Sequence, residues 1–255
     1  MPRIRVRDIE IYYEVQGSGP RLLFIGGSGG DLRNKPGVFD GPLIKRFEVL
    51  AFDQRGLGRS DAPAGPYSMA DYGEDAAGLI EALSFGPAQE LVCRHPEVVT
   101  RLVLACTSPG GRERASFPLH QLQDLSDRER AIRMTEISDT RYDARWREAN
   151  PDDAERLIEI ALARTQPRDQ EAVRGQHLQL EARSHHDTFE RLGNVSQPVY
   201  LCAGKHDGIA PPENQHAMAE ALPNARLEFF DGGHLFLIQD RSAFKKIADF
   251  LLEAT

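Results

Sequence analysis

The chain has few cysteines and no long apolar run, and each of these features excludes certain classes of protein. Its 255 residues include only three cysteines, and these lie far apart, at Cys93, Cys106 and Cys202. An odd, scattered set predicts buried thiols in a reducing compartment rather than a disulfide framework or a metal site. No run of about 18 apolar residues is present to cross a membrane, and residues 1–7 lack the apolar core of a signal peptide. We therefore expect a cytoplasmic protein with no membrane partner.

An excess of positive charge is also missing. The chain has 31 basic and 39 acidic residues, which give a net charge of −8 and a pI near 5.5. Because nucleic-acid binding depends on basic patches, we expect no nucleic-acid partner. The 40% hydrophobic and 27% charged content is ordinary for a folded domain. At this length one large core with an insertion is feasible, and nothing in the composition indicates the oligomeric state.

Strand-like and helical segments alternate along much of the chain. We expect strands at 9–15, 22–25, 47–52, 102–105, 199–203 and 226–230, and helices at 76–83, 88–95, 213–222 and 244–252. This order predicts an α/β fold with a mostly parallel central sheet flanked by helices. From 111 to 192 the pattern changes to charged, arginine-rich helices. We predict a core made of 1–110 and 193–255, with 111–192 as a helical cap.

Two chemically active residues follow neighbouring strands in the last fifth of the chain. Asp207 comes after the apolar run 199–203 and a glycine turn, and His234 follows the run 226–230 and two glycines. Open parallel sheets place their sites at the carboxyl ends of such strands. Alone, Asp207 would be explained as a turn cap and His234 as a loop histidine. Together they favour acyl transfer, in which a carboxylate orients a histidine that removes a proton from a weak nucleophile.

A glycine-rich loop, Gly26-Gly27-Ser28-Gly29-Gly30, follows the strand expected at 22–25. A dinucleotide fingerprint would need a glycine at position 32, which is Leu32. The loop is therefore either a plain tight turn or part of an oxyanion hole in which the Ser28 amide points at developing negative charge. The adjacent His185 and His186 lack a third ligand at useful spacing. We expect no metal.

Several segments together resemble the α/β-hydrolase superfamily, most closely its branch of lactonases, esterases and haloperoxidase-like hydrolases. They are residues 26–30 after a strand, Asp53-Gln54-Arg55-Gly56-Leu57-Gly58-Arg59-Ser60, Arg94-His95-Pro96-Glu97 before Arg101-Leu102-Val103-Leu104, Gly204-Lys205-His206-Asp207 and Gly232-Gly233-His234. The resemblance covers nearly the whole chain and weakens over 111–192. It implies Asp207 as triad acid, His234 as triad base, the Ser28 amide as an oxyanion donor, and no cofactor. The family usually has a histidine where Gly26 stands.

The nucleophile motif of that family is missing. There a strand enters a sharp G-x-S-x-G turn, and this chain contains no such motif. In one alignment Ser84-Phe85-Gly86 is the remnant of the turn, with Ser84 the nucleophile and Ala82 in place of the first glycine. In the other it is the loop before the strand, and a single loss of about a dozen residues removed strand, turn and serine together. We prefer the second alignment because it needs one event.

Two functions of different classes follow from this sequence. The first is serine-type hydrolysis of a small carboxylic ester or lactone, in which Ser84 or a lost equivalent attacks the carbonyl group. The second is a catalytically impaired α/β-hydrolase-like protein with a ligand-binding role or no enzymatic role. The resemblance favours the first function, and the missing motif favours the second.

Overall fold

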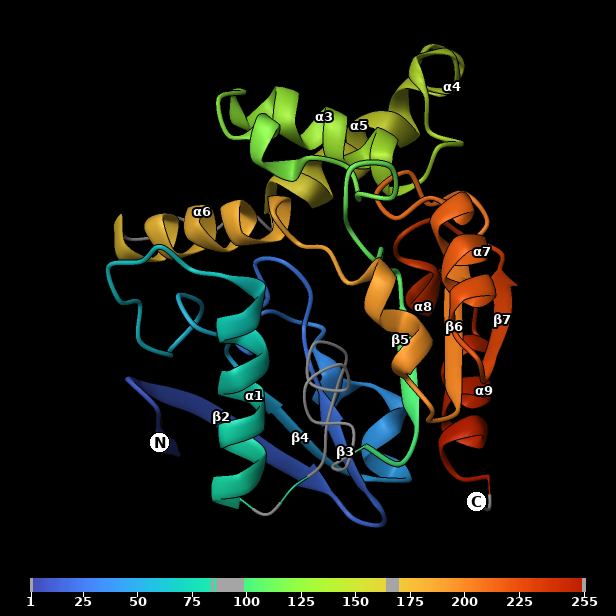
Figure 1. The fold of residues 1–255 in the computed structure, drawn as a ribbon. Helices are drawn as coiled ribbons and strands as arrows, with labels where there is room; N and C mark the ends of the chain where they lie inside the picture. The colour runs from blue at the N-terminus through green and yellow to red at the C-terminus, as the bar shows by residue number, and fades with distance from the viewer. Residues whose placement is uncertain (1, 84, 86–98, 164–169, 254–255) are drawn as a thin grey trace.

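The computed structural model describes residues 2–83, 85, 99–163 and 170–253. Its first sheet has the order β1-β2-β4-β3 (Figure 1). The strands are β1 (Arg3–Val6), β2 (Ile9–Gly17), β3 (Arg21–Phe24) and β4 (Glu48–Phe52). β2 pairs antiparallel with both β1 and β4, whereas β3 runs parallel to β4. The short 3-10 helices η1 (Val38–Asp40) and η2 (Pro42–Lys45) connect β3 to β4.

The second sheet has the order β5-β6-β7, and all three of its strands are parallel. These strands are β5 (Leu102–Ala105), β6 (Val199–Gly204) and β7 (Ala225–Phe230). The strand and helix pattern expected from the sequence is therefore present wherever the structure describes it. The α/β class with a mostly parallel arrangement flanked by helices is confirmed.

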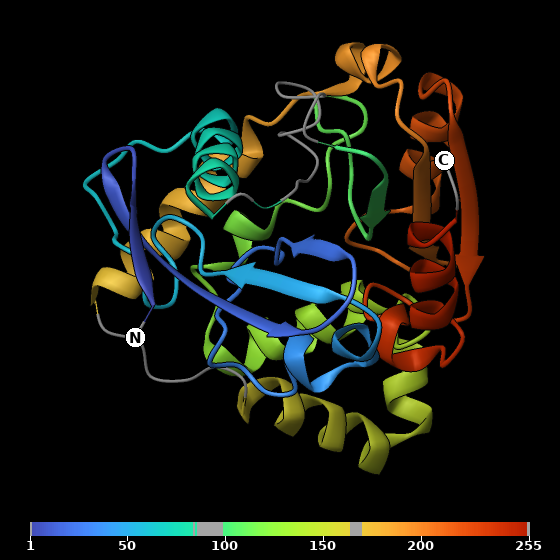
Figure 2. The same ribbon diagram turned by 90° about the horizontal axis from the view of Figure 1, so that it is seen from below.

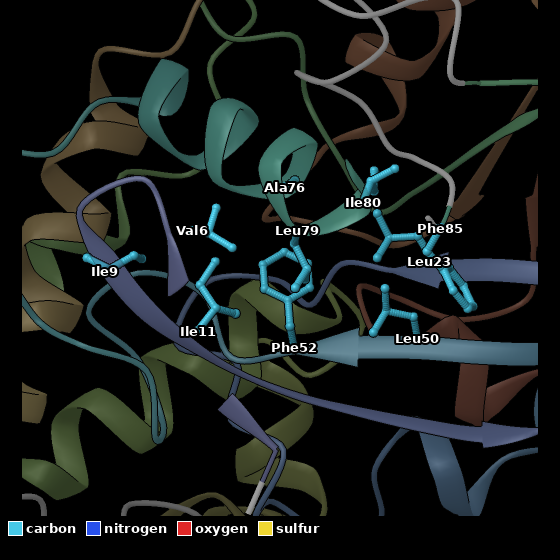
Figure 3. Packing of buried hydrophobic residues seen from close by; sticks show 10 residues of the cluster. All are labelled: Val6, Ile9, Ile11, Leu23, Leu50, Phe52, Ala76, Leu79, Ile80 and Phe85. Carbon is cyan, nitrogen blue, oxygen red and sulfur yellow. The ribbon is translucent and has the colours of Figure 1, made fainter. Parts of the chain in front are cut away.

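Helices cover both faces of the first sheet. α1 (Met69–Leu83) lies on one face, where Leu79 packs with Leu50 and Phe52 of β4 (Figure 3). The alternate β4 residues Val49 and Ala51 point to the other face, as the two-residue period of a strand requires. Burial on both faces explains why β4 reads as a continuous apolar run.

One helix contacts both sheets. Ala248 of α9 (Ala243–Leu251) packs with β4, while its Ile247 and Phe250 pack with Tyr200 and Cys202 of β6. α9, in red, accordingly lies next to both the blue strands of the first sheet and the orange strands of the second (Figure 2). The opposite face of β6 packs against α7 (Pro212–Ala221). α9 therefore joins the two halves of the fold through apolar contacts.

No ladder joins β3 to β5 among the described residues, so each strand is hydrogen-bonded on one side only. The expected single sheet is thus seen as two hydrogen-bonded units. The expected helix at 88–95 lies outside the described residues, as does the point at which the strand loss is placed. That loss stays a prediction.

The segment 111–192 is helical, as expected. It contains η4 (Leu119–Leu122), α3 (Asp127–Ser138), α4 (Ala144–Ala149), α5 (Pro151–Ala163), α6 (Gln170–Ser184) and η5 (Phe189–Asn194). α3 begins at a capping box in which the Ser126 hydroxyl accepts from the Glu129 amide. α3, α4 and α5 gather at one end of the molecule (Figure 1). The cap boundaries at 111 and 192 stay a prediction.

None of the helices in the described part of the chain combines the length and apolar character needed to span a membrane.

Candidate functional site

The structure brings Asp207 and His234 together. Asp207 follows β6 and His234 follows β7, and the Nδ1 atom of His234 lies 2.8 Å from the Oδ2 atom of Asp207. An ionised carboxylate can only accept, so Nδ1 carries the proton and Nε2 is left as a proton acceptor. This is the tautomer that a general base needs.

The Asp207 carboxylate is held rigidly. Its side chain is 0% exposed, whereas that of His234 is 27% exposed. The second carboxylate oxygen accepts from the amides of Ile209 and Ala210, at 2.8 and 2.9 Å. A buried charge is costly unless it is hydrogen-bonded, and these contacts satisfy both oxygens. The pair therefore has a fixed acid at the base of the site and an imidazole that reaches solvent.

Close backbone contact sets the spacing of the two loops. A Cβ atom on Gly204 would lie 2.0 Å from the carbonyl oxygen of Gly233, so only glycine fits there. The His206 amide also donates to the Gly232 carbonyl at 2.9 Å. The glycines that marked both motifs in the sequence therefore allow the loops after β6 and β7 to touch.

The end of α3 is hydrogen-bonded to both loops through its backbone. The Ser138 carbonyl accepts from the His234 amide at 2.6 Å, and the Ile137 carbonyl accepts from the Gly208 amide at 2.9 Å. The Thr140 amide donates to the His206 carbonyl at 2.9 Å. Helix α3, within the predicted cap, therefore helps to hold the Asp207–His234 pair. Sequence reasoning missed these contacts because carbonyl and amide groups occur in every residue and leave no signature.

Replacing Gly233 with alanine should loosen this junction. The added Cβ would lie 2.0 Å from the Ser138 carbonyl oxygen, so α3 and the His234 loop must move apart. We expect a loss of about 1–3 kcal/mol in the free energy of unfolding, measured by denaturant titration. Gly27→Ala is the control, because a Cβ there meets no atom of the described residues within 4 Å. An equal effect in both variants would contradict the packing argument.

The glycine-rich loop is held from two sides. The Gln54 side chain donates to the Gly26 carbonyl at 2.7 Å, and the Gly29 amide donates to the Gln179 side chain of α6 at 2.7 Å. Among the described residues no hydrogen bond reaches the Ser28 amide, and none joins Ser28 to Asp207 or His234. The role of Ser28 as an oxyanion donor stays a prediction.

Asp53 and Arg55, in the segment 53–60, hold loops in place. They are not part of the Asp207–His234 pair. Asp53 is 1% exposed, and its carboxylate accepts from the Leu32 and Arg59 amides at 2.7 and 2.9 Å. Arg55 is 5% exposed and forms an ion pair with Asp75 at 2.8 Å. Burial raises the pKa of Asp53, which its two amide donors counteract.

Ser84 lies outside the described residues, but the structure describes its neighbour Phe85. Phe85 packs with Leu23 and Leu50 beneath α1 (Figure 3). The guanidinium of Arg21, the first residue of β3, lies 5.4 Å from its ring centroid. Phe85 therefore lies by the amino end of β3, whereas the glycine-rich loop follows its carboxyl end, roughly 13 Å away over four residues.

Cys106 joins the site although sequence reasoning assigned it no role. It follows β5 with a left-handed φ of 53°, and its thiol donates to the His234 carbonyl at 2.9 Å. Burial raises its pKa well above the usual range, and the nearby Asp207 carboxylate adds to the shift. The expected burial of the thiols holds for Cys202, but Cys106 is half-buried and Cys93 lies outside the described residues. The position of Cys106 directly after an expected strand is the sequence signal that could have indicated its place in the site.

Comparison with known proteins places this geometry in a family. The chain matches the α/β hydrolase fold family over residues 20–240. A poly(3-hydroxyalkanoate) depolymerase from Ectopseudomonas oleovorans is 28% identical over 247 residues, covering 89% of this chain and 82% of that protein. A 2-hydroxymuconate semialdehyde hydrolase from Pseudomonas putida is 30% identical over 274 residues, covering 94% of this chain and 89% of that protein.

The fold has a solved counterpart as well. The crystal structure of an enol-lactonase from Burkholderia xenovorans LB400 matches with a TM-score of 0.76 at 24% identity, covering 99% of this chain and 100% of the enol-lactonase. The family match spans most of the sequence, and the paired acid and histidine follow its strands. The chain therefore belongs to the α/β hydrolase fold family.

Proposed function

We propose that this protein hydrolyses small carboxylic esters or lactones by acyl transfer, without a cofactor. The observation that carries the proposal is the 2.8 Å contact between His234 and a fully buried Asp207. The relatives named above add support, because the depolymerase and the semialdehyde hydrolase are both enzymes. They do not favour the alternative of a catalytically impaired protein.

Each residue has a distinct role in this reaction. The Asp207 carboxylate holds His234 in the tautomer with a free Nε2 and stabilises the imidazolium that forms. His234 takes the proton of the attacking hydroxyl group and returns it to the leaving alcohol. The Ser28 amide donates to the oxyanion of the tetrahedral intermediate. Only the acid and the base are in contact in the described residues.

The proposed reaction also needs a nucleophile close to His234. Among the described residues no serine hydroxyl is hydrogen-bonded to His234. Cys106 is near the pair, but its thiol faces the His234 carbonyl and the Asp207 carboxylate, and a raised pKa keeps it protonated. The position of Phe85 at the amino end of β3 supports the alignment in which Ser84 is a loop residue. We predict that Ser84 lies beyond hydrogen-bond reach of His234.

A fluorophosphonate probe tests the proposal, since it reacts only with an activated serine. The proposed activity requires one labelled serine per chain, located by mass spectrometry of peptides, and hydrolysis of an acetate ester or a small lactone by the same sample. Labelling should disappear in His234→Ala but persist in His206→Ala. A label on Ser84 would overturn the preferred alignment. Absence of both labelling and turnover would overturn the proposed activity and leave the non-catalytic alternative.

A further inference from the structure

Three metal-binding side chains meet where the strands of the second sheet end. Cys106 follows β5, Asp207 follows β6 and His234 follows β7, and these strands are parallel neighbours. One sulfur, one carboxylate oxygen and one ring nitrogen from these residues all lie within 4.8 Å of one another. The residues are separated by many positions in the sequence, so spacing along the chain gave no sign of the cluster.

We propose that Cys106, Asp207 and His234 bind a divalent transition-metal cation of the Zn²⁺ type. Thiolate, carboxylate and imidazole are the three ligand classes that Zn²⁺ takes in proteins. Zinc bonds of about 2.0–2.3 Å place tetrahedral ligand atoms about 3.3–3.8 Å apart. The three ligand atoms lie within 4.8 Å of one another, so the widest pair would have to close by up to about 1 Å. The 2.8 Å contact between His234 and Asp207 would have to widen.

The burial of the three ligands suits a cation that arrives from solvent. The Asp207 side chain is 0% exposed and anchored by two amides, and Cys106 is half-buried. The His234 side chain is 27% exposed and can adjust. On binding, the Cys106 thiol releases its proton to solvent and the S–H bond is replaced by a sulfur–metal bond. The ionised carboxylate binds as it stands. The neutral imidazole binds through Nε2 as it stands, or through Nδ1 once its proton has moved from Nδ1 to Nε2, and a water molecule completes the fourth position.

Metal binding and hydrolysis exclude one another at this site. A cation on Nδ1 of His234 breaks the hydrogen bond to Asp207, and a cation on Nε2 occupies the atom that accepts the proton. The cation is therefore an inhibitor of the proposed activity. This inhibition rests on the proposed function, whereas the binding itself does not.

Spectroscopy of the purified, metal-free protein tests the binding directly. Titration with Cd²⁺ should give a thiolate-to-metal charge-transfer band that saturates at one equivalent, and Co²⁺ should give the visible spectrum of a tetrahedral site. Zn²⁺ should raise the melting temperature, because a ligand that binds only the folded state stabilises it.

Variants assign the ligands. Cys106→Ser should remove the charge-transfer band and weaken Zn²⁺ binding on the order of 100-fold, since even outer partners of a ligand contribute 10–100-fold. Cys202→Ala, Cys93→Ala and His185→Asn are controls that should leave binding unchanged. Zn²⁺ should inhibit ester hydrolysis by the parent but not by Cys106→Ser.

A measurement on the unmodified chain covers the case in which the variant fails to fold. Zn²⁺ should protect Cys106 from alkylation by iodoacetamide, as followed by mass spectrometry. A band that survives in Cys106→Ser, its loss in a control variant, or alkylation of Cys106 at the same rate with and without Zn²⁺ would overturn the proposal. These readouts need no catalytic activity, so failure of the proposed function leaves them interpretable.

Discussion

Replacing His234 with alanine should abolish ester hydrolysis while the protein stays folded. The variant loses the group that moves the proton, and the expected fall in kcat is on the order of 10⁴-fold or more. Stability should change little, because the side chain is partly exposed and, among the described residues, makes one side-chain hydrogen bond, to Asp207. Ester turnover and thermal melting, measured on the same sample, separate the two effects.

His206→Ala is the matched control for this substitution. His206 lies on the loop after β6, and its hydrogen bonds in the described structure come from its backbone. Asp207→Asn should also reduce kcat on the order of 10⁴-fold, because an amide cannot hold the required tautomer. If His234→Ala hydrolysed esters at a rate within a few fold of the parent rate, the assignment of His234 to a catalytic triad would be wrong. If the parent hydrolyses esters no faster than buffer does, the same substitutions are compared in a chain that carries an inserted strand ending in Gly-x-Ser-x-Gly.

Insertion of a strand that ends in Gly-x-Ser-x-Gly, between Ala88 and Gln89, should raise both stability and activity. β3 and β5 each pair on one side only in the described residues. Each buried amide or carbonyl left without a partner costs about 1–3 kcal/mol. A restored ladder would therefore add several kcal/mol to a total of about 5–15 kcal/mol. The new serine would arrive opposite an acid and a histidine that are already in contact.

The same insertion with alanine in place of serine separates the two gains. We expect both versions to have the higher melting temperature. The serine version alone should hydrolyse esters faster than the parent and carry a fluorophosphonate label on the inserted serine. A lower melting temperature together with no labelling would show that the deletion alignment is wrong. The fold would then be one adapted to its shorter sheet.

The sequence predicted Asp207 and His234 correctly as neighbours because one physical rule covers both. Each follows an apolar run that is long enough for a strand, and the ends of parallel strands converge. The rule needs no knowledge of the tertiary structure. The same rule applies to Cys106, which follows β5, whereas the number and spacing of the cysteines along the sequence give no sign of its position.

Other contacts around the site have no signature in the amino-acid sequence. The contacts of Ser138 and Thr140 with the site use backbone atoms, so their side chains carry no information about them. The support of the glycine-rich loop by Gln179 joins positions 150 residues apart. Local patterns therefore predicted the elements and the proximity of Asp207 to His234. The junctions between distant segments depend on the folded arrangement.

The position of α9 has a consequence for how the protein is made. This helix is synthesised after every strand of both sheets, yet its Ala248 covers β4 and its Ile247 and Phe250 cover β6. Until it emerges from the ribosome, the nascent chain presents two apolar faces that are incompletely covered, since they lack these three side chains. Such faces are prone to association with other chains. A chaperone that holds the nascent chain should therefore matter most in the interval between completion of β7 and docking of α9.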